Sequence, residues 1–110
     1  MNTEKNDVAV QEENLVELVE IEEFGKKNEK PPKAKKYKIR IDKEKYTVEV
    51  SQMTGRELLV LAQKNPPERY TISQKFHGGQ PKKIGLDEIA DFTTPGVERF
   101  MTLPLDQTEG

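Results

Sequence analysis

Two runs of alternating apolar and polar residues within residues 37–50 constrain the fold of this chain more than any other feature. In YKIRID the residues of one face are Tyr37, Ile39 and Ile41, and those of the other are Lys38, Arg40 and Asp42. YTVEV repeats the pattern, with Tyr46, Val48 and Val50 on the inward face. Period two predicts half-buried strands, and two such runs this close predict an antiparallel hairpin. Because Lys43-Glu44 is poor chemistry for a two-residue turn, we expect a longer loop.

A helix signal follows the hairpin. Thr54 precedes Glu57 by three residues, which is the spacing of a capping box. One apolar stripe of this helix consists of Leu58, Leu61 and Ala62. The dipeptide Pro66-Pro67 is expected to end the helix.

The remaining segments predict a return to strands. YTISQKF (70–76) alternates, residues 83–85 favour a short strand, and VERFMTL (97–103) favours a last strand. LDEIADF (86–92) predicts one or two helical turns, with Leu86, Ile89 and Phe92 facing inward. The order strand, strand, helix, strand, short strand, short helix, strand predicts a two-layer α+β domain of the β-grasp, or ubiquitin-like, type.

The first 36 residues have a different character. Residues 1–25 hold eight acidic residues and a single lysine, whereas residues 26–36 are rich in lysine and contain Pro31-Pro32. We therefore expect a disordered or partly ordered N-terminal extension with a solvated linker over 1–36, the domain over 37–103, and a flexible tail over 104–110.

One acidic and apolar segment stands out in this extension, and periodicity leaves both helix and strand open for it. Its apolar members are Leu15, Leu18, Val19, Ile21 and Phe24. Such mixtures resemble peptides that add a strand to an exposed sheet edge. The expected target is the basic domain, either this chain's own or that of a second copy, in which case the segment would mediate self-association. A tail with chance apolar residues is the alternative.

Composition narrows the function classes. The chain has no cysteine, which excludes a disulfide scaffold, a thiol nucleophile and a cysteine-based zinc site. No apolar run approaches a membrane span and no signal peptide is evident, so we expect a cytoplasmic protein with no membrane partner. The lysine run lacks interleaved aromatic residues, so no nucleic-acid partner is expected. No set of nucleophile, base and orienting group is present, so we expect no enzyme activity, no metal and no cofactor.

The stretch from Tyr37 to about Leu105 resembles the bacterial multiubiquitin-type family of β-grasp modifiers. The resemblance is carried by YKIRIDKEKYTVEV, MTGRELLVLA, YTISQKF and GVERFMTLP, and most specifically by Thr54–Leu58 and Val97–Phe100. The family often carries tandem domains and ubiquitin-like tails commonly end in two glycines, whereas this chain has room for one domain and ends in one glycine. The resemblance implies four kinds of partner, namely an activating enzyme that uses ATP, a conjugating enzyme, a metal-dependent isopeptidase and target proteins.

The expected functional residues follow from this resemblance. Gly110 is the expected conjugation residue. Because glycine has no Cβ, its carboxylate can approach and attack ATP without a steric clash. The tail residues expected to contact the activating enzyme are Leu103, Leu105 and Glu109. The outward sheet face, an expected electrostatic docking surface, carries Lys38, Arg40, Glu49 and Lys75. An ordinary solvated face is the alternative for these four residues. A sulfur carrier with a C-terminal thiocarboxylate and a non-conjugated interaction module are the alternative functions.

Overall fold

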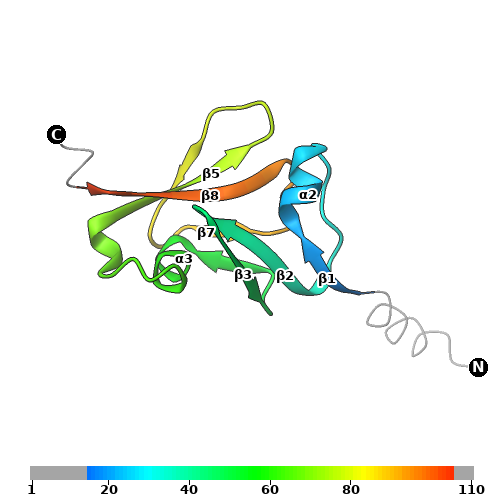
Figure 1. Ribbon diagram of the computed structural model, residues 1–110, viewed down its shortest axis with the longest axis horizontal. Coiled ribbons are helices and arrows are strands. Elements are labelled where there is room, and N and C mark those ends of the chain that lie inside the picture. The colour runs from blue at the N-terminus through cyan, green and yellow to red at the C-terminus, as the bar shows by residue number, and fades with distance from the viewer. Residues whose placement is uncertain (1–14, 106–110) are drawn as a thin grey trace, which may run out of the picture.

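The main sheet contains the hairpin that the alternation predicts. The computed structural model describes residues 15–105 (Figure 1). Strand β2 (Ala34–Ile41) pairs with β3 (Glu44–Val48) in antiparallel register, with Ile39 opposite Tyr46. The side chains of Tyr37, Ile39 and Ile41 are buried, so the predicted inward face of β2 is confirmed.

The other strands extend from the second edge of β2. The sheet order is β1-β2-β8-β5-β6, with bounds β1 Val16–Glu20, β8 Val97–Pro104, β5 Tyr70–Phe76 and β6 Lys82–Ile84. Strands β1 and β8 run parallel to β2, and β5 is antiparallel to β8. Because β1 and β8 pair with different stretches of β2 while β3 occupies the opposite edge, β1 continues the sheet where β8 does not reach.

Helix α3 (Gly55–Leu61) packs on the inward face of this sheet. Its capping box is present, since the Glu57 amide donates to Thr54 Oγ1 at 3.1 Å and the Thr54 amide donates to Glu57 Oε1 at 2.8 Å. Leu58 and Leu59 are fully buried, although the predicted stripe contained Leu58 and not Leu59. The helix ends at Leu61, ahead of the prolines, and a short 3-10 helix η1 (Pro67–Arg69) leads into β5.

Three aromatic rings form the centre of the core. The Phe92 ring centroid lies 5.9 Å from that of Tyr37 and 6.1 Å from that of Phe100. The other fully buried large side chains are Ile21, Ile39, Ile41, Leu58, Leu59 and Ile72. Together these elements form the predicted two-layer α+β domain of the β-grasp type.

The local predictions for residues 86–92 and for Val50 are wrong. The segment 86–92 contains no helix, because β7 (Ile89–Asp91) pairs with β4 (Gln52–Thr54) as a second, two-stranded sheet. Ala90 is buried there, and Ile89, expected inward, is 55% exposed. Val50 was also expected inward and is exposed, since the chain leaves the hairpin after Val48.

The turn of the hairpin is tighter than expected. Ile41 pairs with Glu44, so Asp42-Lys43 is a two-residue connection. Asp42 has a φ of 56°, a left-handed conformation that aspartate tolerates better than most residues. The longer loop was expected from the poor turn chemistry of Lys43-Glu44, whereas the dipeptide that forms the turn is Asp42-Lys43.

The N-terminal part of the described chain packs on the domain. Strand β1 is followed by helix α2 (Ile21–Lys26), and β2 begins at Ala34, three residues before the expected start. The linker expected to be solvated is held at several points. Pro31 is buried, Lys30 Nζ donates to the Thr93 carbonyl at 3.0 Å, and the Gly96 amide donates to the Glu29 carbonyl at 3.4 Å. The division into extension, domain and tail stays a prediction. Within residues 15–105 no helix has the length and apolarity to cross a membrane.

Candidate functional site

The last strand delivers the chain to the expected reactive tail. Strand β8 stays paired with β5 as far as Pro104, which lies opposite Tyr70, and Thr71 Oγ1 donates to the Leu103 carbonyl at 3.4 Å. The Leu103 side chain is 44% exposed and Leu105 is half-buried. Their role as contacts for an activating enzyme stays a prediction. Glu109 and Gly110, the other expected tail residues, lie outside the described residues.

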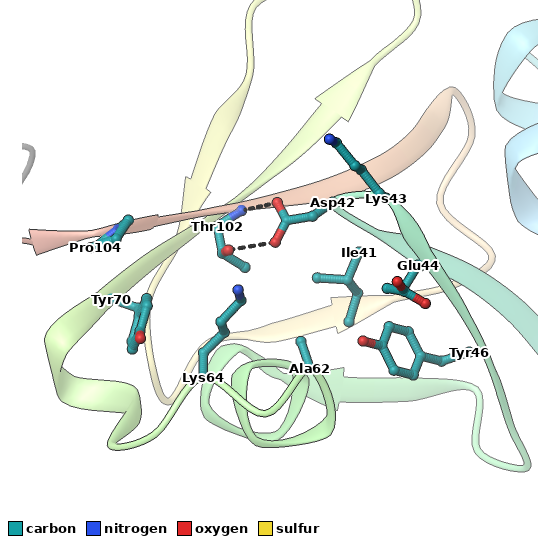
Figure 2. A pocket seen from close by; sticks show the side chains of 10 residues that line it. All are labelled: Ile41, Asp42, Lys43, Glu44, Tyr46, Ala62, Lys64, Tyr70, Thr102 and Pro104. Carbon is teal, nitrogen blue, oxygen red and sulfur yellow. Dashed lines mark hydrogen bonds between the residues drawn. The ribbon is translucent and has the colours of Figure 1, made fainter.

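An aspartate from the hairpin turn holds β8 just before this exit. The Asp42 carboxylate accepts from the Thr102 amide at 2.8 Å and from Thr102 Oγ1 at 2.6 Å (Figure 2). The Asp42 amide donates to the Phe100 carbonyl at 2.8 Å. We name this set of three hydrogen bonds the Asp42–Thr102 clamp. It joins the tip of the β2–β3 hairpin to the C-terminal end of β8.

A hollow of about 330 Å³ lies beside the clamp, and we call it the exit hollow. The residues that line it, all drawn in Figure 2, are Ile41, Asp42, Lys43, Glu44, Tyr46, Ala62, Lys64, Tyr70, Thr102 and Pro104. Lys64 Nζ lies 5.9 Å from the Tyr70 ring centroid, within cation–π range. Cationic, acidic and aromatic groups therefore meet next to the point where the chain leaves the sheet.

Two of the four expected docking residues on the outward sheet face are engaged within the molecule. Arg40 Nη1 donates to Glu22 Oε2 at 3.0 Å, and Lys75 Nζ donates to Glu98 Oε1 at 3.2 Å. These acids offset the positive charge that the sequence places on that face. Lys38 is half-buried on β2, and Glu49 is exposed just beyond β3. The docking role of the four residues stays a prediction.

Helix α2 and strand β1 supply most of the acids that neutralise this face. Glu20 on β1 accepts a hydrogen bond from Lys45 on β3, and this bond lowers the pKa of the Glu20 carboxyl while it raises that of Lys45. Glu17 Oε1 also lies 3.8 Å from Nζ of Lys35 on β2. Acids on the N-terminal segment thus face bases on the hairpin, which matches the expected charge complementarity.

The apolar residues of the N-terminal segment divide into buried and exposed sets. Val19 and Ile21 are buried, and Phe24 packs against the core. Leu15 is half-buried and Leu18 is 45% exposed. The structure therefore shows a strand followed by a helix in this segment, and both pack on the chain's own sheet.

An apolar hollow on the opposite side of α3 from the sheet did not follow from the sequence patterns. It measures about 510 Å³ and is lined by Val50, Gln52, Met53, Arg56, Glu57, Val60 and Leu61. Val60 is 51% exposed. The available signal was that Val60 is a large apolar residue outside the predicted helix stripe, whereas the alternation assigned Val50 to the inward face of the hairpin. Within residues 15–105 no cluster of three or more acidic or histidine side chains is arranged to hold a metal ion.

A mixed sheet packs on one face against helix α3, and its strand β8 leads to the C-terminal tail. This arrangement defines the chain as a ubiquitin-like β-grasp protein. A family model described as Multiubiquitin matches residues 37–104. The chain therefore belongs to the multiubiquitin family. In the parallel comparisons, no curated protein and no solved structure matches it.

Proposed function

We propose that this protein is a ubiquitin-like modifier whose Gly110 carboxylate is activated and transferred to target proteins. The observation that carries the proposal is the family membership of a domain whose last strand, β8, ends at Pro104, six residues before Gly110 in the sequence. The chain serves as the substrate of the reaction, so it needs no catalytic residue of its own.

The proposed chemistry has four balanced steps. A carboxylate oxygen of Gly110 attacks the α-phosphate of ATP, and pyrophosphate leaves. A nucleophile of the activating enzyme attacks the acyl carbon of the adenylate, and AMP leaves. A nucleophile of the conjugating enzyme attacks the same carbon and releases the nucleophile of the activating enzyme. A target amine then attacks this carbon, loses its proton and releases the nucleophile of the conjugating enzyme. Because ATP is required, we place the reaction in the cytoplasm.

Glycine suits these steps for a steric reason. In the first step the carboxylate must reach the α-phosphate, and each later attack approaches the acyl carbon next to Cα. A residue without a Cβ leaves both approaches open. A metal-dependent isopeptidase would undo the conjugation by delivering water to the same carbonyl, which releases the target amine and restores the Gly110 carboxylate. The proposed partners are therefore the activating enzyme, the conjugating enzyme, the isopeptidase and the targets.

The test is intact mass after incubation of the chain with its activating enzyme and ATP. Deletion of Gly110, or extension of the chain beyond it, should abolish covalent transfer, and Gly110→Ala should transfer at an intermediate rate. Gly79→Ala is the control, because its new Cβ would meet only Phe76 Cβ at 3.8 Å. Transfer that survives deletion of Gly110 would contradict the proposal. Exchange of one oxygen for sulfur would indicate a sulfur carrier, and an unchanged mass would favour the interaction module.

A further inference from the structure

Among residues 15–105, no strand pairs with the β2 side of β8 near the tail exit. Strand β2 pairs with β8 at Ile41 and Phe100, and its chain then turns away at Asp42. Strand β8 continues to Pro104, and in this last stretch β5 is the one described strand that pairs with it. The backbone groups of β8 that point away from β5 would therefore be open from Thr102 onward.

The side chain of Asp42 takes the place of the missing strand. The Thr102 amide points away from β5 and donates to Asp42 Oδ1 at 2.8 Å, where a further β2 residue would have supplied a carbonyl. Alternation along a strand turns the nitrogen of Pro104 to the same side, and proline has no N–H. The open side of β8 thus presents no free donor at these two positions.

We propose that Asp42 is a positioning residue that sets the direction in which the tail leaves β8. Its carboxylate is held by a left-handed turn at the hairpin tip, and it holds Thr102 through both the amide and the hydroxyl. Thr102 lies two residues before Pro104, whose ring fixes φ. Figure 2 shows Asp42 joined to Thr102 by these two hydrogen bonds, with Pro104 further along β8. The clamp therefore ties the end of β8 to the hairpin.

The consequence for activation rests on the function proposed above. A tail that leaves the sheet in one direction loses less entropy when an activating enzyme binds it, so the clamp lowers the KM for the modifier and leaves kcat nearly unchanged. The reaction takes place at Gly110, far from Asp42 in the sequence. Loss of the clamp should therefore raise KM with little change in kcat, whereas loss of the reacting group would not leave kcat unchanged.

The variants separate the clamp from general stability. Asp42→Gly removes the carboxylate and still accepts the positive φ. Thr102→Val removes the hydroxyl, and Thr102→Ser restores it. Thr93→Val is the matched control, because Thr93 donates its amide at 2.8 Å and its hydroxyl at 2.7 Å to Asp91, in a loop next to the β4–β7 sheet.

The first measurement needs no enzyme. Hydrogen exchange at the Thr102 amide of the full chain should accelerate about tenfold in Asp42→Gly and stay unchanged in Thr93→Val. Residual dipolar couplings of Leu103 and Leu105 should change in the first variant alone. Unchanged exchange or unchanged couplings in Asp42→Gly would overturn the proposal, whether or not the chain is a modifier.

The second measurement is ATP-dependent loading of the activating enzyme. Asp42→Gly and Thr102→Val should raise KM about fivefold to tenfold with kcat within about twofold, and Thr102→Ser and Thr93→Val should keep the wild-type KM. Equal KM values for Asp42→Gly and Thr93→Val would overturn the positioning role. If wild type is not loaded at all, the modifier function fails, and the exchange and coupling data alone decide whether Asp42 directs the tail.

Discussion

Gly25 on α2 shows how closely the N-terminal helix approaches the sheet. A Cβ built on Gly25 would collide with the carbonyl group of Val97 and with the Cα of Glu98, which are backbone atoms that cannot rotate away. Helix α2 therefore lies against β8 at a distance that only glycine permits.

Gly25→Ala should consequently destabilise the protein. We expect a loss of about 1–3 kcal/mol in the free energy of unfolding, because α2 must move off β8 to make room. Urea unfolding followed by circular dichroism measures it. Gly79→Ala is the matched control and should change the free energy by less than about 0.5 kcal/mol, since its Cβ meets only ordinary contacts. Equal effects of the two substitutions would show that α2 does not lie flush on β8 in solution.

A second prediction at this scale concerns acid. The amide and the hydroxyl of Thr93 donate to Asp91, and these bonds lower the pKa of the Asp91 carboxyl below its ordinary value of 3.8. A lowered folded-state pKa gives stability that is fully present above the unfolded pKa and is lost as the pH falls through the folded pKa. Asp91→Asn should therefore lower stability at pH 7 by no more than about 1 kcal/mol, because solvent screens this exposed group.

The same substitution should reduce the difference in urea midpoint between pH 7 and pH values below 3.8. Acid titration of the urea midpoint for wild type and Asp91→Asn measures this. An identical pH dependence for the two proteins would mean that the Thr93 bonds do not favour the charged carboxylate.

Single residues also show what sequence patterns can and cannot predict. The capping box at Thr54 and Glu57 was predictable because both partners lie within one helical turn. The clamp was not predictable, because Asp42 and Thr102 are 60 residues apart. The residues around the hairpin turn also favour a longer loop when they are considered alone. The available signal was that aspartate tolerates the left-handed conformation in turns.

At the scale of elements, long alternating segments were predictable and short ones were not. Strands β2, β5 and β8 follow patterns of seven or eight residues, whereas β4 and β7 contain three residues each. Three residues carry too little periodicity to separate a strand from a helical turn, and the pairing of β4 with β7 decides it. Of the candidate site, the course of β8 was predictable, and the internal partners of Arg40 and Lys75 were not.

One prediction tests whether the N-terminal elements pack into the core or only lie near the sheet. Ile21→Ala should cost about 2–5 kcal/mol, as should Leu58→Ala, because both side chains are fully buried in one core. Leu18→Ala, in the same segment but 45% exposed, is the control and should cost less than about 1 kcal/mol. Thermal or urea unfolding measures all three. If Ile21→Ala were as mild as Leu18→Ala, the segment would be a loosely attached arm.

At the scale of the whole molecule, the two ends of the described chain lie apart. Figure 1 shows β1 and α2 beside the N-terminal end of β8, while the C-terminal end of β8 points away from them. The N-terminal segment therefore packs at the end of β8 that is opposite to the tail exit. Partners that grip the tail and partners that bind the α2 side of the sheet would meet different surfaces.

A molecule built in this way should unfold as one unit that includes β1 and α2. Val19 and Ile21 belong to the same buried cluster as Ile39, so separating the segment from the sheet would expose apolar faces on both sides. Each such side chain contributes about 1.5–3 kcal/mol through burial.

In native-state hydrogen exchange, the protected amides of residues 17–21 should open with a free energy within about 1 kcal/mol of that of Ile39. High salt should change this little, because it weakens the exposed Glu17–Lys35 and Glu20–Lys45 pairs and leaves the buried contacts intact. Exchange of residues 17–21 at a much lower free energy, with Ile39 still protected, would instead show a detachable segment.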